Sequence, residues 1–213
     1  DPDSEYAFTF DHLGRTLTVS NAGTSGVPTV VLTSSYDANS QRTGLAAEIG
    51  SNNDLLNSYS YDDLGRLTRI EQIGQSGGNV VANKAANYAY NANSRWTTIT
   101  VQAKPSSTWN EVATSTFTYD ALDRLTALEH KHGTTTIASY GWTFDVGSRV
   151  TQLSGPDGTS DYNYDNTSQL VGADHSYQTD ESYSFDENGN RTMSGYDTGD
   201  NNQLLSDGAY NYE

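Results

Sequence analysis

The chain has 213 residues, a formal net charge of −16 and no cysteine. Disulfides are excluded, and eleven basic against 27 acidic residues argue against binding to nucleic acid, which requires a basic patch. The hydrophobic content of 34% is low for a compact globule, whereas 11% aromatic residues is too much for a disordered chain. No apolar run approaches the ~18–20 residues that span a bilayer. A thin sheet with rows of aromatic rings fits this composition, because each ring buries a large area.

Taken in chain order, the predicted elements are eight β-hairpins with one or two aromatic residues, an acidic or amide residue and, in all but one, an arginine after the turn. The copies are Phe8-Thr9-Phe10-Asp11 with Arg15, Tyr36-Asp37 with Arg42, Tyr59-Ser60-Tyr61-Asp62 with Arg66, Tyr88-Ala89-Tyr90-Asn91 with Arg95, Phe117-Thr118-Tyr119-Asp120 with Arg124, Trp142-Thr143-Phe144-Asp145 with Arg149, Tyr162-Asn163-Tyr164-Asp165 with Gln169, and Tyr183-Ser184-Phe185-Asp186 with Arg191. A half-copy, Tyr210-Asn211-Tyr212-Glu213, follows them. Successive Asp or Asn positions lie 20 to 29 residues apart, which is the spacing of stacked repeats.

The segments between the hairpins are predicted loops and apolar strands. Residues 28–33 are rich in β-branched side chains and predict a strand, and residues 74–78 and 104–107 predict loops. Residues 45–56 also allow a helical turn on Ala46-Ala47-Glu48, which the neighbouring Gly50 disfavours. We expect one continuous array over residues 1–213, with no domain boundary.

The third copy shows how the pattern encodes a hairpin. Tyr59 and Tyr61 fall on one face of a strand, where tyrosine suits a half-buried surface. Asp62 can accept hydrogen bonds from the amides that follow it, and Gly65 supplies the positive φ that ends a short loop with a bulge. Arg66 then faces Asp62 across the loop.

Several copies depart from this pattern at the turn. The glycine is replaced by Ser94, Asp123, Ser148 and Ser168, while Asn91 replaces the aspartate and Gln169 the arginine. These replacements are expected to loosen individual turns without abolishing the repeat.

The repeated stretch resembles the YD repeats of the Rhs family, whose signature is an aromatic pair, Asp, a Gly-containing turn, Arg and an aliphatic-Thr step. The resemblance covers about residues 6–213. It implies a tandem array of hairpins in a long antiparallel sheet that spirals into a hollow shell. Such shells enclose the toxic domains of bacterial Rhs and toxin-complex proteins, form part of animal teneurins and occur in wall-associated proteins.

The repeat residues themselves have a structural interpretation. The acid–Arg pairs read as turn chemistry plus exposed ion pairs worth ~0–1 kcal/mol each, and the alternative is a ligand-binding ladder. The aromatic rows read as packing within the sheet, and the alternative is a platform for sugar rings. The better candidates for a ligand surface are the rings outside the pattern, which are Trp96, Trp109, Tyr140, Tyr177 and Tyr196, and we select Trp96 and Trp109 among them.

Metal and catalytic sites receive little support from the sequence. His130 and His132 could ligate a metal with Glu129 or Asp123, but no third ligand stands at a readable spacing. Residues 186–190 allow a calcium loop as the alternative to a hairpin turn. We find no catalytic motif and predict no catalytic residue, resident metal or cofactor.

The sequence therefore predicts a non-enzymatic structural scaffold, extracellular or at the cell surface, without a membrane span in this segment. Its expected partners are other repeats of the same or a longer chain, with self-association through open sheet ends as a further expectation. A carbohydrate-binding module and an arc of a toxin-enclosing shell are the alternatives.

Overall fold

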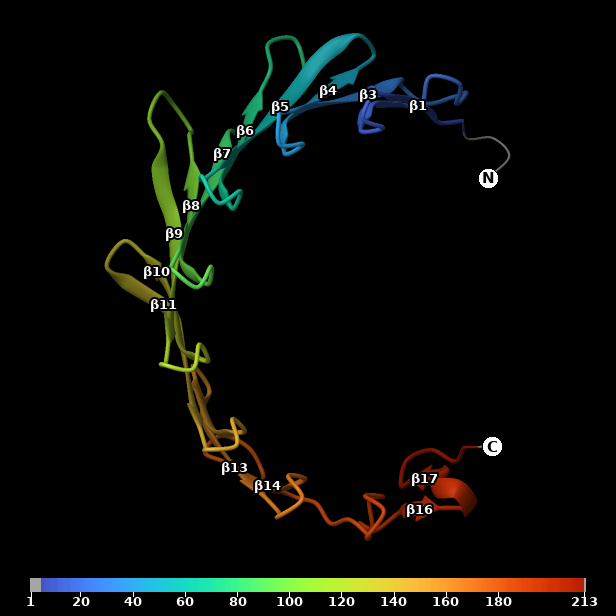
Figure 1. Ribbon diagram of the computed structural model, residues 1–213, viewed down its shortest axis with the longest axis vertical. Helices are drawn as coiled ribbons and strands as arrows, with labels where there is room; N and C mark the ends of the chain where they lie inside the picture. Colours follow the sequence, from blue (N-terminus) through green and yellow to red (C-terminus); the bar gives the residue numbers. More distant parts are fainter. Residues whose placement is uncertain (1–4, 213) are drawn as a thin grey trace. The chain divides into compact units, whose positions relative to one another are not determined.

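The structure is a computed structural model that describes residues 5–212 (Figure 1). Fifteen strands follow one another in chain order in one antiparallel sheet, and two further strands form a second sheet. The one helix of the described residues is the three-residue 3-10 helix η1 (Asp200–Asn202), so none has the length to cross a membrane. The predicted all-β class and antiparallel hairpin array are confirmed.

Tertiary contacts divide the chain into two compact units, Asp1–Thr118 with Glu129–Ile137, and Tyr119–Leu128 with Ala138–Glu213. The strands up to the boundary are β1 (Ala7–Phe10), β2 (Thr16–Ser20), β3 (Val30–Tyr36), β4 (Arg42–Ile49), β5 (Asn52–Tyr61), β6 (Leu67–Gly74), β7 (Lys84–Tyr90), β8 (Trp96–Ala103) and β9 (Asn110–Tyr119). Strand β9 ends in the second unit with Tyr119, and strands β10 (Leu125–His132) and β11 (Thr135–Phe144) also contribute residues to both units. The remaining strands are β12 (Val150–Gly155), β13 (Gly158–Tyr164), β14 (Leu170–His175), β15 (Glu181–Ser182), β16 (Tyr196–Thr198) and β17 (Leu204–Asp207).

The alternative helical turn in residues 45–56 is wrong. Strand β4 continues to Ile49, and β5 begins at Asn52. Leu45 pairs with Asn57, and Leu55 pairs with Ala47. Cross-strand pairing therefore outweighs the helix propensity of the alanines.

Six YD hairpins carry a bulge in the return strand near the turn. In the third hairpin Tyr59 lies opposite Ile70 and Tyr61 opposite Leu67, with a register shift between Ser60 and Tyr61. The same shift separates Thr9 from Phe10, Thr143 from Phe144 and Asn163 from Tyr164. The extra residue lies in the return strand and is Thr68 in the third hairpin, so this bulge is separate from the one predicted at Gly65. The predicted bulge is formed where Gly65 and Arg66 both bond to Asp62.

The two faces of the sheet differ in chemistry. The paired aromatic residues share one face with aliphatic partners such as Ile70. The residue between the two rings points to the opposite face, where hydroxyl groups pair across the strands, as Thr9 does with Thr18 at 2.6 Å and Thr143 with Thr151 at 2.8 Å. The aromatic rows are therefore one side of a single sheet layer.

A conventional hydrophobic core is absent from residues 5–212. The buried hydrophobic residues described there are Ala47, Ala85 and Ala173. Most rings and aliphatic side chains are half-buried, because no second layer covers them. Stability must therefore come largely from contacts between neighbouring hairpins.

Tyrosine hydroxyl groups supply one such contact. The tyrosine before the turn donates a hydrogen bond to a backbone carbonyl in the return strand of the preceding hairpin. The pairs are Tyr36 to Thr16 (2.8 Å), Tyr61 to Arg42 (2.9 Å), Tyr90 to Leu67 (2.7 Å) and Tyr164 to Val150 (2.8 Å). These four tyrosines thus fix their hairpins to the ones before them.

We expect Tyr61→Phe to lower the free energy of unfolding by about 1 kcal/mol, because it removes the hydrogen bond to the Arg42 carbonyl and keeps the ring. Tyr59→Phe is the matched control, since that hydroxyl is not part of the contact between hairpins. Urea denaturation of the two variants checks the difference. Equal midpoints for both would contradict the role assigned to the Tyr61 hydroxyl.

Candidate functional site: contacts between successive turns

The eight predicted turns have the same backbone geometry, which we number from the Asp or Asn as position 0. In the third turn the Asp62 amide donates to the Arg66 carbonyl at 2.9 Å, and the Gly65 amide donates to the Asp62 carbonyl at 2.9 Å. One carboxylate oxygen of Asp62 accepts from the amides of Leu64 and Arg66. All eight turns repeat these four hydrogen bonds.

Two arginines of the predicted pattern lie one residue beyond the position assigned to them. Position +4 is Gln41 in the second turn and Asn190 in the eighth, so Arg42 and Arg191 stand at position +5. The geometry of the loop fixes this count, because the position 0 amide bonds to the +4 carbonyl. The pairings of Asp37 with Arg42 and of Asp186 with Arg191 are therefore wrong.

The position +5 residues contact the first aromatic ring of the next hairpin instead. The Arg42 guanidinium lies 5.0 Å from the centre of the Tyr59 ring. Arg191 lies 5.7 Å from the Tyr196 ring and donates to its hydroxyl at 3.2 Å. These arginines also join hairpins, by a different route.

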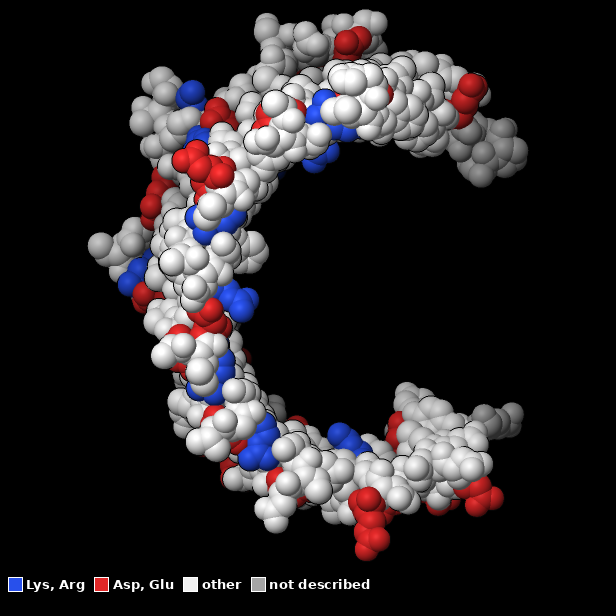
Figure 2. Space-filling view, in the orientation of Figure 1, with Lys and Arg blue, Asp and Glu red and all other residues white. Residues whose placement is uncertain are grey.

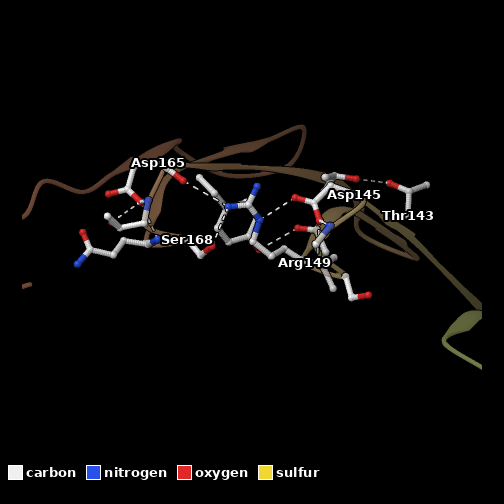
Figure 3. Close-up of polar contacts among 12 residues, drawn as sticks. Thr143, Asp145, Arg149, Asp165 and Ser168 are labelled. Atoms are coloured by element: carbon white, nitrogen blue, oxygen red, sulfur yellow. Dashed lines mark hydrogen bonds and ion pairs between the residues drawn. The ribbon is translucent and has the colours of Figure 1, made fainter. Parts of the chain in front are cut away.

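An arginine at position +4 joins its own turn to the next one (Figure 3). The Arg149 Nε donates to Asp145 at 2.6 Å, while its Nη1 donates to the carbonyl of Asp165 at 3.3 Å and to the Ser168 hydroxyl at 3.2 Å. Its guanidinium also lies 4.7 Å from the centre of the Tyr164 ring. One side chain thus makes an ion pair, two hydrogen bonds and a cation–π contact.

The same inter-turn contact recurs at three other arginines. Arg15 reaches Asp37, Ser40 and the Tyr36 ring; Arg66 reaches Asn91, Ser94 and the Tyr90 ring; Arg124 reaches Asp145, Ser148 and the Phe144 ring. In each case Nη1 lies 3.1 Å from the backbone carbonyl and 3.1 Å from the serine hydroxyl. The acid–Arg pairs are therefore links between hairpins as well as turn chemistry.

The serines at position +3 complete the contact. Ser40, Ser94, Ser148 and Ser168 have φ of 60° to 70°, in the left-handed region that glycine adopts more readily. Their turns keep all four backbone hydrogen bonds, so the expected loosening is not seen in the geometry. Serine at this position is therefore an acceptor for the preceding arginine, a role that the local sequence pattern does not reveal.

Where position +3 is glycine, a different side chain approaches it. The Gln41 amide donates to the Gly65 carbonyl at 2.8 Å, and a Cβ placed on Gly65 would lie 3.2 Å from that amide nitrogen. In the same way, a Cβ on Gly189 would lie 3.1 Å from Nε2 of Gln169. Arginine thus precedes serine at four junctions and glutamine precedes glycine at two, whereas Arg95 precedes Asp123.

A ninth turn, which the sequence pattern did not reveal, follows the eighth. The Gly199 amide donates to the Gln203 carbonyl at 2.8 Å, and Asn202 has φ of 60°, as position +3 requires. The Asn190 side chain donates to the Asn202 side chain at 3.0 Å, which continues the inter-turn contact. The sequence pattern did not reveal this turn because Gly199 stands at position 0 in place of Asp or Asn. The part of the pattern that it keeps is an aromatic residue at position −3, Tyr196.

The two tryptophans proposed as a ligand surface lie in different surroundings. Trp96 is 46% exposed and lies between the rings of Tyr88 and Phe117, with ring centres 6.4 and 6.2 Å away. Trp109 is half-buried beneath the cationic groups of Arg69 and Lys104, 5.1 and 5.5 Å from its ring centre. Trp96 therefore stands at position +5 between the first rings of two hairpins, Tyr88 and Phe117, whereas Trp109 is already in contact with two cations.

The candidate metal residues take part in ordinary hydrogen bonds. His130 Nδ1 lies 2.8 Å from the Ser115 hydroxyl, and Glu129 pairs with Lys131. Asp186 accepts three hydrogen bonds from Asn188 and Asn190 as a turn residue. Within residues 5–212 no three His, Cys, Asp or Glu side chains gather as metal ligands would.

A second Ser–His pair lies in the second unit. The Ser160 hydroxyl is 2.7 Å from His175 Nδ1 and 3.0 Å from the Tyr177 hydroxyl, and Glu181 lies 3.9 Å from the other ring nitrogen. The combination resembles a nucleophile with its base and acid. Ser160 is only 1% exposed, however, so no substrate can reach its hydroxyl in this conformation.

The arginines lower the pKa values of the turn aspartates and are dispersed along the sheet. Hydrogen bonds from the backbone amide and then the side chain of Arg149 hold the pKa of Asp145 below its usual value, and hydrogen bonds led by the Arg66 amide do the same for Asp62. The face shown in Figure 2 carries lysine and arginine as separate small spots rather than one basic patch. The cations are used locally, beside an acid or a ring.

The comparison with protein families agrees with the geometry of the turns. A profile of the teneurin YD-shell matches residues 32–213. The chain belongs to the teneurin YD-shell family. Its general role is accordingly that of a structural shell or scaffold. No curated protein matches the chain.

Solved structures resemble this YD-shell chain only distantly. TcdB2-TccC3 without its hypervariable C-terminal region is 16% identical with a TM-score of 0.43, and the match covers 88% of this chain and 12% of that one. The Tc holotoxin pore of Photorhabdus luminescens is 15% identical with a TM-score of 0.39, covering 87% and 13%. A porin-like protein from Bacteroides uniformis is 15% identical with a TM-score of 0.38, covering 84% and 86%. The chain thus spans about an eighth of the Tc toxin chains, and none of these similarities carries a functional argument.

A double-mutant cycle tests the pairing between positions +4 and +3. We expect Arg66→Gln to lower the free energy of unfolding by about 1–3 kcal/mol, because it removes hydrogen bonds from a charged donor. Adding Ser94→Gly recreates the pair seen at Gln41 and Gly65. The double variant should therefore be more stable than the sum of the single changes predicts, by about 0.5–3 kcal/mol. Simple additivity in urea denaturation would show that the two positions do not recognise each other.

Acid should unfold the chain through the turn aspartates. Their pKa values are lowered in the folded state, so the stability they contribute is present above the unfolded pKa near 4 and is lost as pH falls through the folded pKa. We expect the melting temperature to be nearly constant between about pH 5 and 7 and to fall below about pH 4. Asp62→Asn should make that fall shallower, whereas the exposed neighbour Asp63→Asn should not. Identical profiles for the two variants would exclude this contribution of Asp62.

Proposed function

We propose that this chain is a segment of the wall of a larger, non-enzymatic YD shell, located outside the cell or at its surface. The observation that carries the proposal is the inter-turn contact of the position +4 side chain, seen from the first hairpin to the second and again at later turns. Membership of the YD-shell family supports it. A wall needs this arrangement, because each hairpin must hold the next in register.

The thinness of the sheet supports a wall rather than a globular domain. Each hairpin lacks a core of its own and covers its rings against its neighbours, so it gains stability only within an array. The hydroxyl-rich face and the aromatic face then present two different surfaces, one polar and one largely apolar. A wall with such faces can meet water on one side and other protein on the other.

The arrangement of reactive groups supports a non-enzymatic role. The arginines at position +4 in the four contacts above are bound to an aspartate and to the next turn, and the Ser160 hydroxyl is inaccessible. These arginines and this serine thus serve the packing of the sheet.

Electron cryomicroscopy of the full-length protein that carries this chain tests the proposal. We expect β1 to β15 to be consecutive strands of a larger β-wall, with further strands hydrogen-bonded to its edge. The proposal fails if the segment forms a separate body whose β1 edge faces solvent.

The proposed location has its own measurement. Protease added to intact cells should cut the protein within exposed loops such as residues 104–108, whereas a cytoplasmic control protein should stay intact. Cutting that requires cell lysis would place the protein inside the cell and remove the extracellular part of the proposal.

A further inference from the structure

The first turn has glycine at position +3, but no glutamine side chain of residues 5–212 lies against that glycine. Gly14 stands at position +3 with φ of 76°, as Gly65 does. The space beside Gly65 and Gly189 is taken by a glutamine amide, whereas a Cβ on Gly14 would meet no atom within 4 Å. Among residues 5–212, the side chain that should fill this space is therefore missing.

The adjoining strand is also an open edge. Strand β1 pairs with β2 and with no other strand of the described residues. Its rings are unusually exposed, at 62% for Tyr6, 54% for Phe8 and 58% for Phe10. In the later hairpins the equivalent rings are covered in part by the +4 and +5 side chains of the preceding hairpin. Such a cover is what β1 lacks.

Steric fit explains why glycine selects glutamine in these contacts. The glutamine amide lies 3.1 to 3.2 Å from where a Cβ would stand, which is tighter than ordinary van der Waals contact. The longer arginine instead reaches past the turn to a serine hydroxyl and a backbone carbonyl, 3.1 to 3.3 Å away. A turn with glycine at position +3 offers no hydroxyl to that arginine.

We propose that the free edge of β1 and the first turn bind the return strand of another YD hairpin that has glutamine at position +4. The eighth hairpin provides the template, since it has Phe185 at position −1 and Gly189 at position +3, as the first has Phe10 and Gly14. Its predecessor has Gln169 at position +4. The partner's glutamine amide would donate to the Gly14 carbonyl, and its strand would pair with β1 and cover the exposed rings.

The partner lies outside residues 5–212. The two hairpins in the chain with glutamine at position +4 already use their return strands, because β4 pairs with β5 and β14 with β15. A second copy could offer neither without breaking those pairs. The partner is therefore a YD hairpin elsewhere in the same polypeptide or in another chain. This inference rests on the proposed wall function but concerns the identity of one neighbour.

Binding of hairpin probes to the full chain tests the inference. The probes are backbone-cyclised peptides of residues 158–175, one with native Gln169 and one with Gln169→Arg, cyclised because a free two-stranded hairpin is only marginally stable. Hydrogen–deuterium exchange of residues 6–13 reports protection of β1. We expect the glutamine probe to protect β1 at about a fivefold lower concentration than the arginine probe, which corresponds to one neutral hydrogen bond.

The Gly14→Ser chain is the matched variant and should reverse this preference. Four other turns hold serine at the same φ, so the fold tolerates the change, and exchange of β9 checks that the rest of the sheet is intact. The inference is overturned if neither probe protects β1, or if both protect the two chains equally. The exchange experiment measures the selectivity of one turn, whereas cryomicroscopy tests whether the chain is part of a wall. Either experiment can therefore fail while the other succeeds.

Discussion

The structure depends on one recurrent interaction, in which the side chain four residues after the turn aspartate reaches the next turn. A single-layer sheet has no core to hold its strands together, so register must be set at each junction. The arginine does this by adding directional hydrogen bonds and ring stacking to the strand pairing. Because each contact joins only neighbours, the repeats can vary in length without disturbing it.

The serine at position +3 combines a local cost with a gain between hairpins. A left-handed conformation costs a residue with a Cβ roughly 1 kcal/mol, which glycine would avoid. The serine hydroxyl accepts a hydrogen bond from a charged donor in return, and such bonds are among the stronger ones in proteins. Glycine turns solve the same problem differently, by admitting a glutamine amide close to the backbone.

The rings act in two distinct ways. In four hairpins the ring just before the turn lies beneath the preceding guanidinium. In the three of them where that ring is a tyrosine, its hydroxyl also donates to a carbonyl of the preceding hairpin. The ring two residues earlier meets the position +5 side chain, as Tyr59 meets Arg42 and Phe117 meets Trp96. The strongly acidic chain therefore keeps most of its few arginines where they join two repeats.

The sequence by itself determined the repeat, the hairpins, the aromatic face and the turns with positive φ, because those follow from local patterns such as Tyr59-Ser60-Tyr61-Asp62 and from Gly65. Only the tertiary structure decided which residue stands at position +4, so that Gln41 and Asn190 replaced Arg42 and Arg191 there, and it alone revealed the turn at Gly199. It also decided that Ser94 is an acceptor for Arg66, 28 residues earlier. The physical reason is that hydrogen bonding within a turn is encoded locally, whereas a contact between two turns exists only once their strands are paired.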